Sequence, residues 1–426
     1  MIGTALIGQR HLMKTARKIK SLLGKSLFST AEKPCVLIIV ENLPVPLDRR
    51  VWQESCALRD AGYQVVVICP KMRGFRKSFE ILDDIHIYRH WISDEAGGFA
   101  GFFLEYASAL IGEMALACRV WWTYRPDIIH LCNPPDLLFL VALPFKLLGA
   151  RIIYDIHDAW PEMFEAKFGS RGIFYWFVRM AEFLTFRTCD VAIATNESVR
   201  DIALSRGKLN ESQVFVVRTA PKVNKAVVEP DGSLKKGRAH LVGYVGVMGN
   251  ADGVDFLIRA AAHIVHKLGR QDIHFLLMGT GPEFESLVAL RDNLNLQDFV
   301  DMPGRVTNEF LFSALKTMDM GASSDPINPY NHHCTMNKVL EYMTFGKPQV
   351  LFDLKEGRAS AADAAHYVPE STPEALAEGI IHLADNPEIR NQMGKLGLQR
   401  MENHLNWDIS VRNLLKAYKA VLSVKY

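Results

Sequence analysis

The chain has 426 residues, of which 49% are hydrophobic and 23% are charged, and its formal net charge is +2 at pH 7. This length exceeds what one ordinary hydrophobic core organises, so we expect two domains of similar size. The nearly balanced charge argues against a general nucleic-acid-binding protein, so partners have to be sought in local features.

Residues 1–33 form a basic N-terminal extension. Before Glu32 it carries six Lys and Arg residues and no acidic residue, and apolar residues recur at helical spacing. A basic amphipathic helix suits an anionic membrane surface; a disordered basic tail and an organelle-targeting peptide are the alternatives. The segment lacks a signal-like apolar region, and the cysteines form no CxxC pair, so we expect core thiols in a reducing compartment.

From Cys35 onward, buried strands alternate with helices. The pattern predicts a helix over 50–61 and strands over 35–40, 64–69, 128–132, 151–156, 191–195 and 214–217. Continuous apolar strands that alternate with helices indicate a parallel sheet covered on both faces.

Two segments are more apolar than a soluble core requires. Residues 99–122 are interrupted by Glu105, Glu113 and Arg119, so we do not expect a transmembrane span there. Residues 174–177 are aromatic and lie between two arginines, a combination that fits a membrane interface. Core helices on the parallel sheet are the alternative for both segments.

A polar stretch over 220–238 interrupts the alternation of strands and helices and predicts a linker. The alternation restarts with strands over 241–246 and 274–278, a helix near 254–268 and a loop over 279–282. A last helix over 407–422 is expected to pack on the first domain. We therefore predict two doubly wound α/β domains: 34–222, joined by the C-terminal helix 405–426, and 223–404.

Residues 334–348 predict a short helix, followed by a strand over 349–352. The free N–H groups and the dipole at a helix start attract phosphate oxygens, and Lys338 would add a mobile positive charge. The carboxylate of Glu341, one turn later, can accept two hydrogen bonds from a ribose diol. This pattern is typical of a nucleotide-sugar site; an ion pair at i, i+3 on an amphipathic helix is the alternative.

Four segments in order, 43–52, 154–158, 243–249 and 335–341, resemble those of family 4 glycosyltransferases. The resemblance covers about residues 34–424 and is strongest to bacterial enzymes of surface-polysaccharide assembly. It implies a GT-B fold, in which two Rossmann-like domains face each other across a cleft. It also implies that the second domain holds a nucleotide-sugar donor, that the first holds the acceptor, and that transfer proceeds with retention and without a metal.

The resemblance also implies functional residues. His157 matches the cleft histidine of the family and lies in a polar cluster with Asp158. Arg50 matches a common arginine of the family at the start of a helix, and Arg49 stands beside it. Either arginine would stabilise the leaving diphosphate electrostatically; surface arginines without such a role are the alternative. We therefore predict catalytic roles for His157, Asp158 and Arg50, and donor binding by Gly246, Met248, Gly249, Gly279, Val306, Asp325, Thr335, Met336, Asn337, Lys338 and Glu341.

The chain departs from the family pattern in two ways that bear on the donor site. Val247 and Asp252 stand where the family has a basic pair, so charge has to come from Lys338 and the Arg49–Arg50 pair. His333 stands where the first of two paired glutamates is usual, and Asp325 is the candidate replacement. The loop 279–281 lacks the third glycine of a dinucleotide fingerprint, which argues against a nicotinamide-dependent oxidoreductase.

The sequence thus predicts a metal-independent, retaining glycosyltransferase without cofactors. Its expected partners are a nucleotide-sugar donor, a lipid-linked or glycan acceptor, and the inner face of the cytoplasmic membrane, which the basic extension contacts from the cytoplasm. Two alternatives stay open: a nucleotide-sugar epimerase of the same fold, and a non-catalytic membrane-associated member of an assembly complex.

Overall fold

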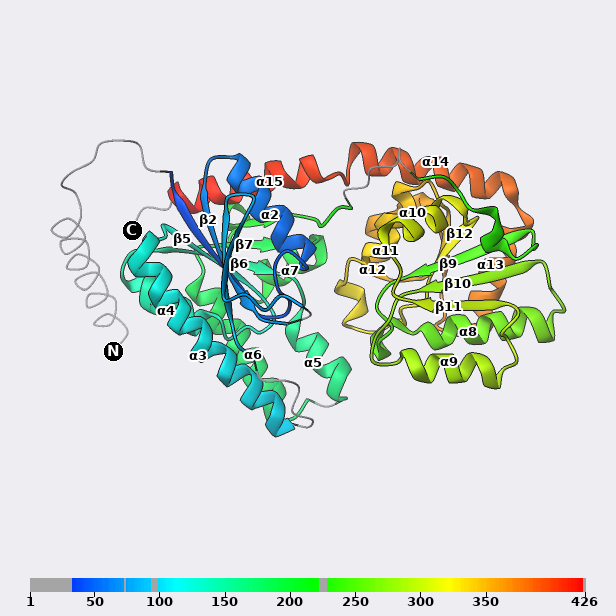
Figure 1. Cartoon of the computed structure of the whole chain (residues 1–426), viewed down its shortest axis with the longest axis horizontal. Coiled ribbons are helices and arrows are strands. Elements are labelled where there is room, and N and C mark those ends of the chain that lie inside the picture. Colours follow the sequence, from blue (N-terminus) through cyan, green and yellow to red (C-terminus); the bar gives the residue numbers. More distant parts are fainter. Residues whose placement is uncertain (1–32, 73, 93–98, 170, 222–227, 424–426) are drawn as a thin grey trace. The chain divides into compact units, whose positions relative to one another are not determined.

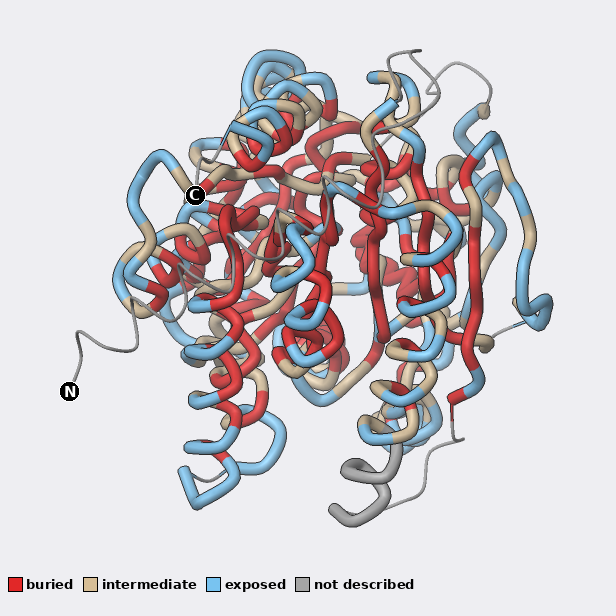
Figure 2. The backbone as a smooth tube through the Cα atoms, turned by 90° about the vertical axis from the view of Figure 1, so that its left-hand side faces the viewer, coloured by how far each residue is buried: buried red, intermediate tan, exposed pale blue. Residues whose placement is uncertain are grey.

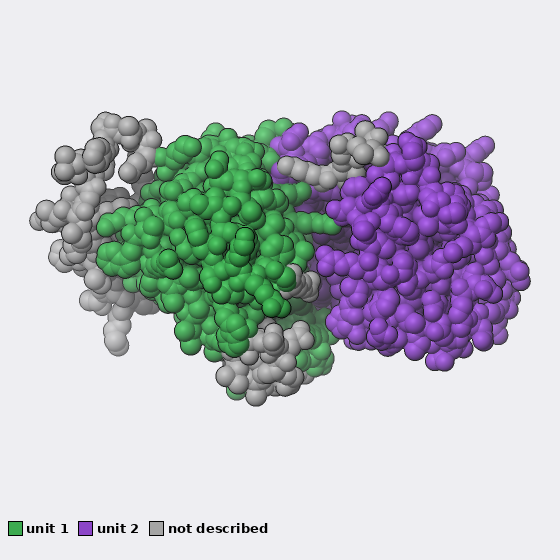
Figure 3. All heavy atoms as spheres, viewed as in Figure 1, with its two compact units in different colours: residues 1–217, 411–426 green, residues 218–410 purple. Residues whose placement is uncertain are grey.

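The computed structural model describes residues 33–72, 74–92, 99–169, 171–221 and 228–423, without the side chains of 99–105 (Figure 1). The basic extension and part of the expected linker therefore lie outside the described residues. The chain divides into two compact units, drawn in two colours in Figure 3: residues 1–217 with 411–426, and residues 218–410.

The first unit is built on an eight-stranded sheet in the order β3-β4-β2-β1-β5-β6-β7-β8, in which β3 is antiparallel to β4 and every other pair is parallel. The strands are β1 (Cys35–Val40), β2 (Gln64–Pro70), β3 (Phe79–Leu82), β4 (Ile85–His90), β5 (Ile128–Cys132), β6 (Arg151–Ile156), β7 (Val191–Ala194) and β8 (Val214–Val216). All six predicted strands are present. The sequence prediction missed β3 and β4, because β3 is a partly exposed edge strand without a continuous apolar run.

Helices cover both faces of this sheet. They are α2 (Arg49–Asp60), α3 (Phe99–Tyr124), α4 (Phe139–Leu147), α5 (Trp160–Phe168), α6 (Ile173–Thr188), α7 (Glu197–Ser205) and α15 (Trp407–Ser423). On one face, side chains of α3, α4, α6 and α7 pack against alternate strand residues such as Leu37, Leu131 and Tyr154. On the other, Tyr418 of α15 meets the ring of Tyr63 edge-on. Across the part of the chain that the structure describes, no helix has the length and hydrophobicity that a membrane crossing requires.

The second unit is built on a six-stranded parallel sheet in the order β11-β10-β9-β12-β13-β14. The strands are β9 (His240–Val245), β10 (Ile273–Met278), β11 (Val300–Gly304), β12 (Met320–Ser323), β13 (Gln349–Phe352) and β14 (Ala365–Val368). The helices are α8 (Val254–Ala262, continued by a π-helical turn over His263–Lys267), α9 (Phe284–Asn293), α10 (Asn308–Thr317), α11 (Asn337–Thr344), α12 (Lys355–Ala361), α13 (Pro373–Asp385) and α14 (Pro387–Asn403). The predicted class, two doubly wound α/β domains, is confirmed.

Each sheet has one point at which the strand order reverses. In the first unit β1 lies between β2 and β5, and in the second β9 lies between β10 and β12. Ligands of open α/β sheets bind outside the carboxyl ends of the strands at such points. β1 is buried along its length and β9 at all but its two end residues, so the polar side chains that follow them stand out as candidates. Figure 2 shows the buried stretches of the chain in red.

Candidate functional site

Arg50 lies at the start of α2, directly after β1 and its loop. The helix begins where Asp48 accepts a hydrogen bond from the Val51 N–H at 3.0 Å. The guanidinium donates to both carboxylate oxygens of Asp155, at 3.0 and 2.6 Å, and to the Val217 carbonyl at 2.7 Å. Arg50 is only 6% exposed, so the alternative of a surface arginine is wrong for this residue, whereas Arg49 is exposed. Its predicted contact with a leaving diphosphate stays a prediction.

His157 follows β6 and pairs with the same carboxylate. Its Nε2 lies 2.7 Å from Asp155 Oδ2, and its side chain is 14% exposed. Burial alone lowers the pKa of His157, but the charge of Asp155 outweighs this effect and raises that pKa. Burial likewise opposes ionisation of Asp155, yet Arg50 and His157 hold its pKa well below the ordinary value. Both shifts favour the ionised forms, an imidazolium beside a carboxylate.

Asn133, which follows the neighbouring strand β5, fixes the backbone of the loop after β6. Asn133, directly after β5, accepts hydrogen bonds from the N–H groups of His157 and Asp158, at 2.7 and 3.2 Å. Its amide donates to the Asp158 carbonyl at 2.9 Å and to Asp136 at 2.9 Å. The structure thus brings His157, Asp158 and Arg50 together at the switch point of the first sheet.

A second layer of buried polar groups lies beneath Asp155. His130 Nε2 is 3.4 Å from Asp155 and 3.7 Å from Glu54, while its Nδ1 is 2.7 Å from the Tyr418 hydroxyl. Burial raises the pKa of Glu54. The sequence analysis missed Glu54, His130 and Tyr418. The one available signal was a histidine inside an apolar strand, whereas only the tertiary fold brings Tyr418 to this cluster.

His130, Cys132 and Asp155 have donor atoms within 4.8 Å of one another, as a metal site requires. However, Arg50 binds both oxygens of Asp155. Burial also raises the pKa of the Cys132 thiol well above its ordinary value. Because the guanidinium occupies both oxygens of Asp155, that carboxylate is committed to Arg50 in this structure.

In the second unit, the predicted donor loop 246–249 follows β9 and packs directly on the loop after β10. A Cβ on Gly279 would lie 1.8 Å from the Gly246 carbonyl oxygen, and one on Gly281 would lie 2.5 Å from that of Met248. The Met248 N–H donates to the Thr280 carbonyl at 3.1 Å. The glycine at 279 therefore lets the two loops approach each other.

Lys338, the second residue of α11, points into the unit. Its Nζ donates to both oxygens of Asp325 at 2.7 and 2.9 Å, and lies 3.7 Å from Asp252 and 4.9 Å from the centre of the Tyr244 ring. Burial lowers the pKa of Lys338, but the two carboxylates outweigh burial and raise it. At 7% exposure the lysine is fixed, so the expectation of a mobile charge is wrong: Asp325 and Asp252 hold it in place.

The rest of α11 is seated at the switch point of the second sheet. The Tyr342 hydroxyl donates to the Ala322 carbonyl of β12 and accepts from the Val245 N–H of β9, both at 3.1 Å. Thr335 and Met336 precede the helix, with Met336 in extended backbone; Asn337 opens it, and Glu341 is partly exposed one turn later.

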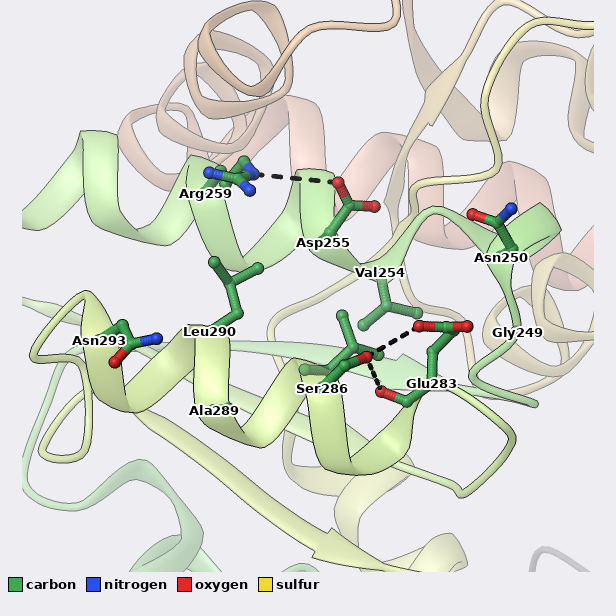
Figure 4. A pocket seen from close by; sticks show the side chains of 11 residues that line it. Gly249, Asn250, Val254, Asp255, Arg259, Glu283, Ser286, Ala289, Leu290 and Asn293 are labelled. Atoms are coloured by element: carbon green, nitrogen blue, oxygen red, sulfur yellow. Dashed lines mark hydrogen bonds and ion pairs between the residues drawn. The ribbon is translucent and has the colours of Figure 1, made fainter.

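Val306, a predicted donor-binding residue, is partly buried and follows β11, and the exposed Arg305, which the sequence analysis did not use, stands directly before it. A groove of about 450 Å³ also adjoins the donor loop at Gly249 and is lined by α8 and α9 (Figure 4). Ser286 on its wall donates to Glu283 at 2.8 Å, and Arg259 lies 3.9 Å from Asp255.

Comparisons with known proteins agree with this arrangement. Residues 47–220 match the model of the glycosyl transferase 4-like domain, and residues 239–386 match that of glycosyl transferases group 1. An uncharacterized glycosyltransferase of Methanocaldococcus jannaschii is 21% identical over 294 residues, which are 67% of this chain and 72% of that protein.

Solved structures share the fold. Sucrose-phosphate synthase of Thermosynechococcus elongatus superposes with a TM-score of 0.72 at 17% identity, over 92% of this chain and all of that one (100%). An Anabaena protein solved in complex with UDP-glucose has a TM-score of 0.64 at 12% identity, over 91% of this chain and 98% of that one. Both matches span nearly the whole chain.

Proposed function

Because the chain belongs to the family 4 glycosyltransferases of the GT-B fold, we propose that it moves a sugar from a nucleotide-diphosphate-sugar donor to a lipid-linked or glycan acceptor. The process it would serve is the assembly of a cell-surface polysaccharide. The observation that carries the donor assignment is the position of α11 at the switch point of the six-stranded sheet: Lys338 of its first turn meets Tyr244 of β9 and Asp325 after β12.

The donor would bind to the second unit. The first-turn N–H groups of α11 meet the diphosphate, and Glu341 accepts hydrogen bonds from the ribose diol. Since Lys338 is already paired with Asp325, it positions the helix start, and the backbone carries most of the phosphate contact. The complex of the Anabaena neighbour with UDP-glucose supports a nucleotide sugar as the ligand class.

The first unit would hold the acceptor and supply His157. Paired with Asp155, the imidazolium donates a hydrogen bond to a hydroxyl of the donor sugar and orders the reacting centre. In retaining transfer on one face of the sugar, the departing phosphate accepts the acceptor proton. The protein then contributes positioning and electrostatic stabilisation, without a metal ion. The chain would act in the cytoplasm, peripheral to the inner face of the cytoplasmic membrane, with residues 1–33 contacting the lipid.

Calorimetric titration with a panel of nucleotide sugars tests the donor assignment. We expect one donor to bind, and Glu341→Ala to weaken its binding at least about tenfold, because one lost hydrogen bond to a charged group is worth roughly 1.5–3 kcal/mol. Glu378→Ala, an exposed glutamate of α13, is the matched control and should leave binding unchanged. If no donor of the panel binds, the proposal fails.

A non-catalytic role is the second candidate, and the observation that favours it is Asp252, which stands beside Lys338 where the family has a cation. Transfer assays with membrane lipid extracts separate the two roles. A transferase forms a glycosylated lipid and loses this activity in His157→Ala with donor binding retained. A non-catalytic protein binds the donor without turnover, and an epimerase converts the donor without any acceptor.

A further inference from the structure

The helices on one face of the first unit present an apolar surface to solvent. We define the α4–α6 face by Leu143 and Leu147 of α4 and by Ile173, Trp176, Met180 and Phe183 of α6, each of which is exposed. Within the described residues, most exposed large hydrophobic side chains belong to α3, α4 and α6. Contiguous apolar patches of this kind mark interaction sites on otherwise soluble proteins.

The exposed residues of α6 follow one stripe of the helix. Ile173, Trp176, Met180 and Phe183 recur at intervals of three or four residues, and Ile173 and Trp176 are 78% and 66% exposed. The opposite stripe, which includes Val178, Ala181 and Phe186, is buried. The helix is therefore apolar on its buried side and on its solvent side, and packing within the unit accounts only for the first.

The stripe continues onto α4, which lies beside α6. Val141, Ala142 and Phe145 of α4 pack on the same face of the sheet as Phe186 of α6, so the opposite sides of both helices point away from the sheet. Lys146 links the helix ends, because its Nζ donates to the Thr188 carbonyl at 2.6 Å. Figure 1 shows α3, α4 and α6 as neighbouring helices of this unit.

The charges around this face are positive. Arg187 lies 5.3 Å from the centre of the Phe183 ring, Arg171 lies 5.7 Å from that of Tyr175, and both arginines are exposed. Of the nearby acidic groups, Glu182 is buried and bound by Arg206, whereas Glu165 is partly buried and pairs with Arg171 at 2.7 Å, which partly balances the charge of that arginine. A surface that combines aromatic rings with neighbouring cations suits the boundary between lipid headgroups and acyl chains.

We propose that the α4–α6 face docks on an anionic lipid bilayer, with its apolar stripe in the interface and its arginines at the headgroups. This geometry predicts two contributions to the free energy of bilayer binding. Burial of the apolar side chains resists salt, whereas attraction of the arginines to anionic lipid weakens as salt rises. This contact is separate from the basic extension and from the transfer chemistry, so it can be tested without a sugar substrate.

Co-sedimentation of the full chain with vesicles tests the proposal, using phosphatidylcholine with and without phosphatidylglycerol at about 0.1 M and about 1 M salt. We expect Ile173→Ser with Trp176→Ser to weaken binding to both vesicle types at high salt at least about tenfold. The matched control changes two exposed apolar residues elsewhere, Ile81→Ser with Leu268→Ser, and should bind as the unchanged chain does. Arg171→Gln with Arg187→Gln should reduce only the low-salt preference for phosphatidylglycerol.

Equal binding by the stripe variant and the control overturns the proposal. So does binding that vanishes entirely at high salt, because a cationic segment would then carry the contact. Sedimentation velocity addresses a second copy of the chain as the occupant. A dimer that the stripe variant dissociates, together with no vesicle binding by the unchanged chain, would assign the face to self-association and also overturn the proposal.

Discussion

The carboxylate of Asp155 organises the polar groups at the switch point of the first sheet. It accepts two hydrogen bonds from Arg50 and lies 2.7 Å from His157 Nε2. Buried ion pairs add little net stability compared with apolar packing, but removing one partner leaves an unpaired buried charge. The cluster therefore fixes the position of His157 and favours its charged form.

This dependence predicts a large effect of Asp155→Asn. The variant removes the carboxylate that binds the buried Arg50 guanidinium at two points and leaves it only Glu54 at 3.1 Å, so we expect the unfolding free energy of the first unit to fall by about 3–5 kcal/mol. Denaturant titration measures it. Asp60→Asn, at an exposed position on α2, should change the value by less than about 0.5 kcal/mol. A loss for Asp155→Asn no greater than that of this control would contradict the interpretation.

The same pair predicts a pH dependence of stability. Because the folded-state pKa of His157 is raised, its pairing with Asp155 stabilises the fold fully below about pH 6.5, the unfolded value. That contribution disappears as the pH rises through the folded pKa. The difference in unfolding free energy between the unchanged chain and His157→Gln should therefore shrink as the pH rises from about 6.5 through the raised folded-state pKa. A difference that does not fall with rising pH would contradict this pairing.

At the scale of elements, the second unit depends on two loops that touch through their backbones. The loops after β9 and β10 meet where Gly279 and Gly281 leave no room for a side chain. Packed backbone does not yield as the end of a flexible side chain does. The shape of the predicted donor loop is thus set by a neighbouring loop that packs against it through its backbone.

Gly281→Ala tests this packing. Its Cβ would lie 2.5–2.7 Å from backbone atoms of Met248, so we expect a loss of about 1–3 kcal/mol in the unfolding free energy of the second unit. We also expect weaker donor binding, because the 246–249 loop has to shift. Gly232→Ala, whose Cβ meets nothing within 4 Å, is the control. Unchanged stability and binding in Gly281→Ala would refute the packing argument.

At the scale of the whole molecule, the chain leaves the first unit after Val217 and returns to it at Val411. The returning helix α15 fully buries Leu414, Ala417, Tyr418 and Val421, and Tyr418 reaches His130 beneath the Asp155 cluster. The C-terminal segment is thus an integral part of the unit that begins the chain.

Deletion of residues 411–426 should therefore destabilise the first unit and leave the second nearly unchanged. Each large side chain that loses its burial removes roughly 1.5–3 kcal/mol of stabilisation. Hydrogen exchange followed by mass spectrometry should report faster exchange in β1, β5 and β6, and unaltered exchange in β9 to β12. An equal increase of the exchange rate in both units would contradict the assignment of this segment to the first unit.

Local pattern was enough to predict the architecture of this protein, because buried parallel strands are continuous apolar runs and their helices have clear ends. The edge strand β3, half exposed, has no such run and was missed with its partner β4. The positions of His157 directly after β6 and of Lys338 at the start of α11 also followed from the sequence, since both depend on neighbours close in the chain.

The tertiary structure decided what those residues contact. Arg50 and Asp155 are 105 positions apart, and His130 and Tyr418 are 288 apart, so no local spacing could indicate that they meet. Lys338 was expected to be mobile, and only the fold brings Asp325 and Asp252 against it. Sequence by itself determined the class of protein and the elements that carry its site; packing determined the charge partners, because burial and proximity are properties of the folded chain.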